Sequence, residues 1–276
     1  MEINHNINYS QLEEMAKKLR DNVIEMLYHA GSGHPGGALS SADIITSLYF
    51  GEVLKHFPQE PYSLDRDVFI LSAGHYCPVL YAALAHSGYF PVPELKTLRK
   101  FGSRLLGHPL YKTLPGIENS GGSLGQGISI ALGVAKAFTI DNKSNRVYCL
   151  MGDGEQEEGQ VWEAALFAAH HKLDNLCAII DVNKIQIDGY TKDVCNTEPL
   201  VAKYEAFNWH VIRIDGHDFN QIISAFNEAS NTKGKPTVII ADTISGKGLP
   251  HLEGTVEIHG KGITTREYDL TRKELI

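Results

Sequence analysis

The chain has 276 residues, 43% of them hydrophobic and 21% charged, and its 33 acidic and 25 basic residues give a formal net charge of −8. This composition excludes intrinsically disordered and fibrous proteins, because enough apolar residues are present to bury a full core. The sequence contains no run of basic residues, so we expect neither nucleic acid nor an anionic lipid surface as a partner.

Targeting signals and metal-binding cysteine patterns are also missing from the sequence. No apolar stretch approaches the ~20 residues of a membrane span, and the N-terminus lacks the basic and then apolar pattern of a signal peptide. We therefore expect a cytoplasmic protein that does not enter a membrane. No C-x-x-C pair occurs, which predicts small buried side chains rather than a zinc site or disulfides at Cys77, Cys149, Cys177 and Cys195.

The first half of the chain is predicted to be mainly helical. Ser10 and Glu13 have the S-x-x-E spacing of a capping box, and apolar residues then recur at helical spacing up to residue 30. Glycines and a proline over 31–37 end that helix. The predicted elements of this half are a strand over 67–71 and helices over 11–30, 41–54, 78–86, 93–101 and 128–138.

The second half alternates regularly between strands and helices. This alternation predicts an α/β fold with a doubly wound, mainly parallel sheet and helices on both of its faces. No linker or internal repeat interrupts the pattern, so we expect a single domain over 1–276 whose last 30 residues form a looser tail. The predicted strands are 147–151, 176–182, 210–214 and 237–242, and the predicted helices are 161–171, 200–207 and 219–230.

Polar residues follow two of these strands directly. Asp153 comes after strand 147–151, and Asn183 comes after strand 176–182, 30 residues further on. In an open parallel sheet, ligands bind beyond the carboxyl ends of the strands, where these two side chains would meet. Either residue alone is also explained by a tight turn or a cap. The pair offers a carboxylate and an amide oxygen, ligands that suit Mg²⁺ or Ca²⁺, and it therefore favours a cation site.

A dinucleotide-binding turn is the rival interpretation of the glycines at 152–154. The third glycine of that motif is replaced by Glu157, and the neighbouring acids would repel a pyrophosphate unless a cation lay between them. The second glycine-rich stretch, 122–127, has the glycine spacing in the wrong order and no strand before it. We therefore disfavour a nicotinamide cofactor.

The stretch from Gly152 to Asn183 resembles the thiamine diphosphate motif, and Glu158-Gly159 with Trp162-Glu163-Ala164 resembles its transketolase version. Other short motifs of that family match in order and at comparable spacing, so the likeness covers nearly the whole chain. What it covers is the diphosphate-binding domain of a transketolase, with its thiamine diphosphate-binding fold. The matching motifs are Ser32-Gly33-His34-Pro35-Gly36, Ser72-Ala73-Gly74-His75, Gly107-His108-Pro109, 122–127 and Ile258-His259-Gly260.

The resemblance implies thiamine diphosphate and Mg²⁺ as cofactors, with Ca²⁺ or Mn²⁺ able to replace the magnesium. Asp153 and Asn183 would bind the metal through their side chains, and Ile185 would bind it through its carbonyl oxygen. Gly152 and Gly154 would let the backbone approach the diphosphate.

Three further residues acquire cofactor-related roles from the resemblance. Gly122 and Leu124 would support the aminopyrimidine. Glu158 would lie at an interface and contact an acidic residue that a partner domain points at the pyrimidine.

Four histidines beside glycines would serve the family's reaction, which moves a two-carbon ketol unit from a ketose to an aldose. Imidazole suits the proton transfers between hydroxyls that such a reaction needs near neutral pH. By the resemblance, His34 and His259 would face the reacting hydroxyls, His108 the terminal hydroxyl of the donor, and His75 the diphosphate and the substrate channel. Two other residues carry little functional weight, His217 as a helix-start residue and Lys247 as a weak candidate for cofactor contact.

In the family, the cofactor lies between two domains, and the second supplies the glutamate that activates the pyrimidine and the basic residues that grip the sugar phosphate. We therefore expect the N-terminal subunit of a split transketolase. It would act with a separate C-terminal subunit that carries the pyrimidine-binding domain, in a heterotetramer with two copies of each. The substrates would be sugar phosphates, with a donor of the xylulose 5-phosphate type.

Three alternatives stay open at this point. The chain could belong to a related thiamine diphosphate enzyme, such as a deoxyxylulose phosphate synthase or a ketoacid dehydrogenase. It could be a transketolase for an unusual sugar or a sulfosugar. A non-catalytic binding protein that retains the fold is the third alternative.

Overall fold

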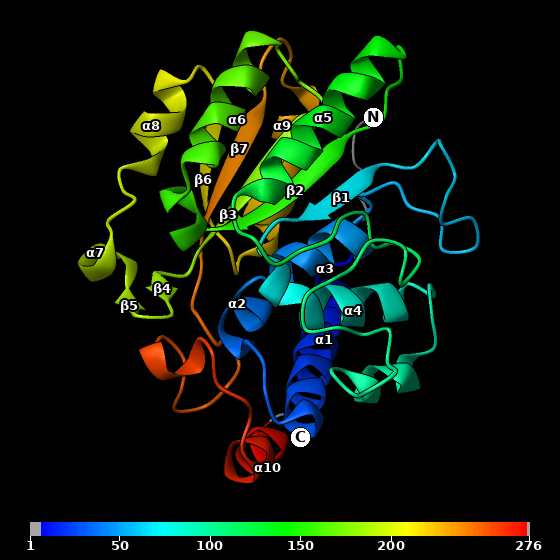
Figure 1. The fold of residues 1–276 in the computed structure, drawn as a ribbon, viewed down its shortest axis with the longest axis vertical. Helices are drawn as coiled ribbons and strands as arrows, with labels where there is room; N and C mark the ends of the chain where they lie inside the picture. The colour runs from blue at the N-terminus through cyan, green and yellow to red at the C-terminus, as the bar shows by residue number, and fades with distance from the viewer. Residues whose placement is uncertain (1–6, 275–276) are drawn as a thin grey trace.

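A five-stranded parallel sheet forms the centre of the computed structural model, which describes residues 7–274 (Figure 1). The strand order is β1-β2-β3-β7-β6, and every neighbouring pair is parallel. All five carboxyl ends therefore lie at one edge. The strands are β1 (Val68–Leu71), β2 (Val147–Gly152), β3 (Leu176–Val182), β6 (His210–Asp215) and β7 (Thr237–Asp242).

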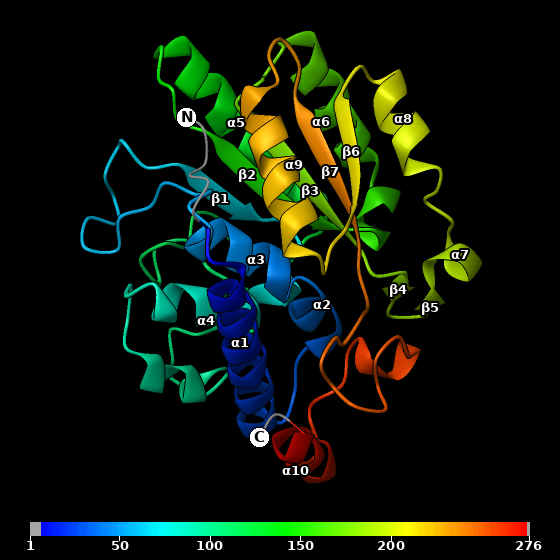
Figure 2. The same ribbon diagram turned by 180° about the vertical axis from the view of Figure 1, so that it is seen from behind.

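Helices cover both faces of this sheet, as the doubly wound prediction requires. One face carries α5 (Gln126–Ile140), α6 (Gly159–His170) and α8 (Leu200–Ala206). The other carries α9 (Phe219–Asn231) and α3 (Ala42–Phe50), which Figure 2 shows from behind. The predicted fold class is confirmed.

Strand β2 shows how one sequence pattern builds two cores. Its side chains alternate between the faces of the sheet. Val147, Cys149 and Met151 join the core under α5 and α6, whereas Tyr148 and Leu150 join the core under α3 and α9. All five are buried, which explains why this strand appears in the sequence as a continuous apolar run.

The remaining elements lie mostly beyond the carboxyl edge of the sheet. Helix α1 packs against α3 and α4, and Figure 1 shows both α1 and α4 below the strands. No helix within residues 7–274 is long and apolar enough to cross a membrane. These elements are α1 (Tyr9–Ala30), α2 (Pro35–Ser40), α4 (Cys77–His86), β4 (Ile185–Gln186), β5 (Gly189–Tyr190), α7 (Thr191–Val194) and α10 (Thr265–Glu274).

Helix α2 is absent from the predicted elements, because Pro35 and the two glycines after it resemble helix breakers. Proline is well tolerated in the first turn of a helix, where its missing N–H has no partner to lose. A Cβ atom at Gly37 would lie 1.7 Å from the ring of Tyr76, so only glycine permits the tight contact between α2 and the residue that follows His75. The predicted helix over 41–54 is shorter in the structure, because α3 ends at Phe50 with Gly51 as its C-cap.

Three smaller expectations were wrong. The N-cap of α1 is Asn8, whose side chain accepts from the Gln11 N–H, and the proposed capping residue Ser10 lies inside the helix. Residues 93–101 form only a 3₁₀ helix over Val92–Thr97, because Arg99 adopts a left-handed φ of 59° and turns the chain away. Cys195 is exposed, whereas the other three cysteines are buried as expected.

The closeness of α5 to the chain after β1 generates a stability prediction. A Cβ atom at Gly127 would lie 2.5 Å from Cα, Cβ and Oγ of Ser72, so Gly127→Ala forces the helix away from the sheet. We expect a loss of roughly 1–3 kcal/mol in the free energy of unfolding, as for overpacked cores. Gly133→Ala in the same helix meets nothing within 4 Å and should stabilise the chain by about 0.5–1 kcal/mol.

Urea denaturation of both variants measures the difference. Equal midpoints for Gly127→Ala and the unsubstituted chain would show that α5 does not pack as closely as described.

Candidate active site

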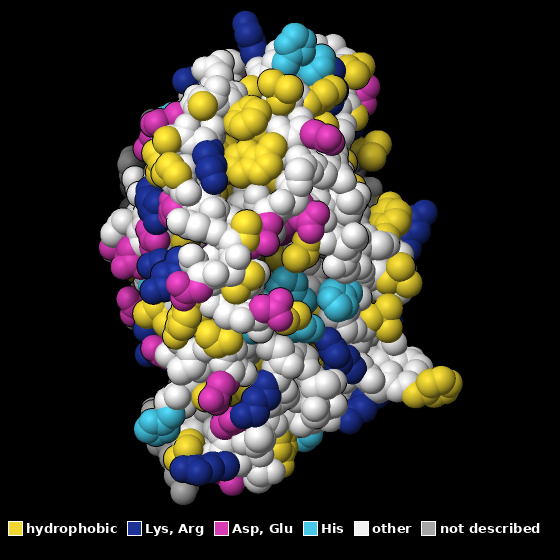
Figure 3. All heavy atoms as spheres, turned by 60° about the vertical axis from the view of Figure 1, so that its left-hand side comes forward, with side chains coloured by type: hydrophobic (Ala, Val, Ile, Leu, Met, Phe, Trp, Pro, Cys, Tyr) yellow, Lys and Arg dark blue, Asp and Glu magenta, His cyan; other side chains and the backbone are white. Residues whose placement is uncertain are grey.

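A cavity of about 340 Å³ opens where the chain leaves the carboxyl ends of β1, β2 and β3. Figure 3 looks onto this part of the surface and shows histidine side chains in a hollow with acidic side chains near it. Asn183 lines a second hollow on the other side of the turn after β3, and Asp153 and Ile185 line both. The other predicted residues that line the cavity are His34, His75, His108, Gly122, Leu124, Gly152, Gly154, Glu158 and His259.

The four histidines reach this cavity from four separate segments of the chain. His34 caps the start of α2, His75 follows β1, His108 lies in the long loop before α5, and His259 follows a short 3₁₀ helix near the C-terminus. The ring centroid of His34 lies 5.2 Å from that of His75, 6.1 Å from His108 and 6.2 Å from His259. Residues more than 200 positions apart in the sequence thus form one imidazole cluster.

Burial and mutual repulsion keep these imidazoles neutral. Burial, together with the neighbouring imidazoles, lowers the pKa of His34 to about 4 and that of His75 to about 3. Burial also lowers the pKa of His108 and of His259. Near neutral pH each ring therefore has a lone pair that can accept a hydrogen bond. Nδ1 of His34 and Nδ1 of His259 are buried and have no hydrogen-bond partner among the described residues.

Asp153 occupies the end of β2, next to the end of β3. The register pairs Gly152 with Asp181, so the residues that follow the two strands lie side by side. The Asp153 carboxylate accepts hydrogen bonds from the Gly154 N–H at 3.0 Å and from the Lys184 N–H at 2.8 Å. Burial, followed by the nearby carboxylate of Asp181, raises the pKa of Asp153 to about 7. A buried carboxylate in this position would be stabilised by a bound cation.

Asp181 is a residue of the site that the sequence analysis missed. It is fully buried at the end of β3 and accepts hydrogen bonds from Ser40 Oγ at 2.7 Å, from Thr243 Oγ1 at 2.5 Å and from Asn183 Nδ2 at 2.7 Å. This last bond turns the amide nitrogen of Asn183 toward Asp181 and its oxygen toward the Ile185 N–H, 3.1 Å away. Its place two residues before Asn183 was the available signal, since metal ligands are commonly held by an acidic neighbour.

The residues at these strand ends suit a metal ion that prefers oxygen ligands. The carboxylate of Asp153, the amide oxygen of Asn183 and the carbonyl of Ile185 are the groups that could hold it, since Mg²⁺ and Ca²⁺ prefer mixed oxygen ligands of this kind. Within residues 7–274, no group of three or more His, Cys, Asp or Glu side chains is placed to hold a metal ion.

Glu155 is an exception to the expectation that the acids around the glycines at 152–154 would face and repel a pyrophosphate. Its side chain is buried and accepts hydrogen bonds from the Ser72 hydroxyl, from the Gly125 N–H at 2.6 Å and from the Gly152 N–H at 3.1 Å. Glu155 therefore joins the chain after β1, the start of α5 and the end of β2. Glu157 remains exposed beside the cavity.

Glu158 is also exposed and lies at the cavity, next to the start of α6. Lys247 is not part of the cavity. Its Nζ lies 3.8 Å from Glu253 Oε2, and its side chain lines a separate hollow beside α1 and α9.

Comparison with known proteins identifies a family for this arrangement. The family described as transketolase, thiamine diphosphate binding domain, matches residues 11–275. The 6-deoxy-6-sulfo-D-fructose transketolase subunit SqwG of Clostridium sp. (strain MSTE9) is 43% identical over 264 residues, which cover 96% of each chain. One of the subunits of the apulose-4-phosphate transketolase of Actinobacillus succinogenes is 40% identical over 272 residues, which cover 98% of each chain.

Solved structures give the same result for the fold. The transketolase of Campylobacter jejuni superposes with a TM-score of 0.91 at 37% identity, over 98% of this chain and 43% of that one. The transketolase of Leishmania mexicana gives a TM-score of 0.90 at 34% identity, over 96% of this chain and 41% of that one. This chain thus spans about two fifths of the length of these structures.

The depressed histidine pKa values generate a prediction for stability against pH. The folded pKa of His75, about 3, lies below the value of about 6.5 expected after unfolding, so acid favours the unfolded chain. Full stability is present above pH 6.5, and His75 alone should cost about 1.4 kcal/mol per pH unit as the pH falls below that value. His75→Asn should therefore flatten the decline between pH 6.5 and 4.

Chemical denaturation at several pH values measures this slope. His170→Asn, at an exposed position near the end of α6, is the matched control and should keep the slope of the unsubstituted chain. Equal slopes for all three chains would contradict the buried, neutral state of His75.

Proposed function

Because this chain belongs to the transketolase family through its thiamine diphosphate binding domain, we propose that it is the cofactor-binding subunit of a two-subunit transketolase. The complex transfers a two-carbon ketol unit from a ketose phosphate to an aldose phosphate. The observation that carries the proposal is the cavity in which four histidines from separate segments lie with Asp153 and Ile185 at the strand ends. Asn183, the third proposed oxygen donor, lines the adjoining hollow together with Asp153 and Ile185.

The strand-end residues hold the metal and diphosphate in this proposal. Asp153 and Asn183 bind Mg²⁺, or Ca²⁺ or Mn²⁺ in its place, through their side chains, and Ile185 binds it through its carbonyl oxygen. Gly152 and Gly154 present backbone without side chains to the diphosphate. When bound, thiamine diphosphate supplies the carbon nucleophile that no side chain of the protein offers.

The histidines handle protons and hydroxyls of the substrate. His34 and His259 have neutral rings and buried Nδ1 atoms that find no partner within residues 7–274, so each can accept a hydrogen bond from a substrate hydroxyl and orient it for proton transfer. His108 is only partly buried and binds the terminal hydroxyl of the donor. His75, the most strongly desolvated of them, lies toward the diphosphate.

A partner subunit completes the site in this proposal. Both same-length relatives named above are called subunits, and the solved transketolases extend well beyond the matched region. Gly122 and Leu124 support the aminopyrimidine from this side, and the exposed Glu158 meets an acidic residue of the partner. Leu166 and Phe167 are 61% and 41% exposed on α6, the helix that Glu158 precedes. We assign these two apolar side chains to the surface that the partner subunit covers.

An unusual sugar is a second candidate for the substrate, beside a donor of the xylulose 5-phosphate type. The names of the relatives specify 6-deoxy-6-sulfo-D-fructose and apulose 4-phosphate, each a sugar with an acidic group. We propose a sugar that carries a phosphate or sulfonate at the end remote from the transferred carbons.

The cofactor role generates a prediction for Asp153→Asn. The substitution keeps the size of the side chain and removes its charge, so thiamine diphosphate with Mg²⁺ should bind the assembled complex at least about 100-fold more weakly. Calorimetric titration of the complex of both subunits measures this affinity. Asp141→Asn, at an exposed position after α5, is the control and should bind as the unsubstituted chain does. Unchanged affinity for Asp153→Asn would overturn the metal site.

The partner generates a second prediction. The chain alone should show almost no ketol transfer, and activity should appear when the product of its neighbouring gene is added. Mass measurement should give two copies of each subunit, and donors of the xylulose 5-phosphate and 6-sulfofructose types can be compared in the same assay. Robust turnover by the purified chain alone would contradict the proposal.

A further inference from the structure

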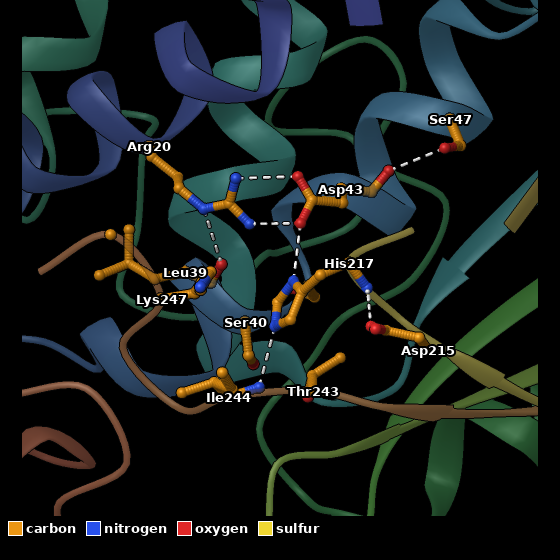
Figure 4. A network of polar contacts seen from close by, with 12 residues as sticks. Arg20, Leu39, Ser40, Asp43, Ser47, Asp215, His217, Thr243, Ile244 and Lys247 are labelled. Carbon is orange, nitrogen blue, oxygen red and sulfur yellow. Dashed lines mark hydrogen bonds and ion pairs between the residues drawn. The ribbon is translucent and has the colours of Figure 1, made fainter. Parts of the chain in front are cut away.

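His217 lies outside the cavity, at the start of α9, and bridges two distant parts of the chain (Figure 4). Its Nδ1 lies 2.7 Å from Asp43 Oδ2, and its Nε2 lies 3.0 Å from the backbone nitrogen of Ile244. A backbone N–H can only donate, so Nε2 must accept with its lone pair. The proton of the neutral ring is then on Nδ1 and faces Asp43. The two contacts together fix both the tautomer and the orientation of the ring.

Asp43 is in turn held from the first helix. Both carboxylate oxygens accept from the Arg20 guanidinium, at 2.8 and 2.6 Å, and the same guanidinium donates to the carbonyl of Leu39 at 3.3 Å. Burial raises the pKa of Asp43, but the hydrogen bonds from His217 and Arg20 and the charge of Arg20 outweigh this effect and hold the pKa below its ordinary value. Asp43 therefore stays ionised, and α1, α3 and His217 form one connected unit.

Ile244 belongs to residues 243–248, here called the post-β7 segment, which is neither helix nor strand. This segment touches the candidate active site at two points. Thr243 Oγ1 donates to Asp181, the carboxylate that orients Asn183. The Gly246 N–H donates to the carbonyl of Gly36 at 3.0 Å, two residues after His34.

Gly36, the acceptor in the second of these contacts, also lies against the backbone at His259. A Cβ atom on Gly36 would lie 2.7 Å from Ser245 Oγ and 3.4 Å from the Cα of His259. The start of α2, the post-β7 segment and the chain at His259 therefore meet without space between them. A shift of Ile244 would move atoms on the metal side and on the histidine side of the cavity together.

We propose that His217 is a positioning residue of the proposed active site: by accepting from Ile244 it keeps the post-β7 segment where Thr243 meets Asp181 and Gly246 meets Gly36. The inference rests on the proposed function for what the site binds. It does not depend on that function for the contacts themselves, which lie within this chain.

His217→Phe and His217→Gln form the matched pair that tests the proposal. Phenylalanine keeps the ring volume but cannot accept from Ile244, whereas glutamine keeps a donor and an acceptor on one side chain. In the chain alone, His217→Phe should raise amide hydrogen exchange in residues 243–248 by about tenfold, because the Ile244 N–H loses its hydrogen-bond acceptor. His217→Gln should restore most of the protection, and the thermal midpoints should stay close.

Binding to the assembled complex separates positioning from a merely structural role. His217→Phe should weaken the affinity for thiamine diphosphate with Mg²⁺ by about tenfold, and His217→Gln should recover most of it. His210→Phe is the control, since His210 also contacts an acid, Glu228, but does not touch the post-β7 segment.

Each outcome decides the proposal. Unchanged amide hydrogen exchange in His217→Phe overturns it. So does an equal loss of affinity for thiamine diphosphate in His217→Phe and His217→Gln, or in His217→Phe and His210→Phe. If the unsubstituted complex binds no thiamine diphosphate, the proposed function fails. In that case the exchange measurement on the chain alone still decides whether His217 holds the segment.

Discussion

The arrangement of the candidate site depends on a buried carboxylate at the end of the central strand. Asp181 has no exposed surface, and a buried charge is tolerated only where donors surround it. Its donors include Ser40 of α2, Thr243 after β7 and Asn183 after β3, which are remote from one another in the sequence. Satisfying one side chain therefore requires three parts of the fold to meet at the carboxyl edge of the sheet, beside Asp153.

The two sides of the cavity have different electrostatic characters. Burial keeps the imidazoles neutral, so they do not offset the carboxylates of Glu157 and Glu158 that line the same cavity. An anionic ligand would meet net negative charge there, and in such a setting a divalent cation provides the compensation. The same neutrality leaves imidazole lone pairs free for hydroxyl groups. A cation site at the strand ends and hydrogen-bond acceptors on the histidines would thus be complementary consequences of burial in one cavity.

The sequence predicted the features that local patterns control. Alternating strands and helices gave the sheet class, and the polar residues after β2 and β3 located the edge at which Asp153 and Asn183 meet. It did not predict α2, whose glycine at 37 is explained only by the Tyr76 ring against it. Nor did it distinguish the inward-facing Glu155 from its exposed neighbours, because that difference depends on donors 30 and 83 residues away. Contacts between residues far apart in the chain leave no pattern in the sequence around either residue.

The post-β7 segment shows why such distant contacts matter for the site. No helix or strand contains this segment, so its position depends on single backbone hydrogen bonds, such as that from Gly246 to Gly36, and on the side chains on either side. Thr243 is held toward the cavity by Asp181, and Ile244 is held on the opposite side by His217. Thr243 donates directly to the buried carboxylate of Asp181, and Ile244 is linked through His217 to the buried carboxylate of Asp43. The cost of burying each carboxylate is offset only while its donors stay in place. The two acids therefore make the position of the segment and the packing of α1, α2 and α3 mutually dependent.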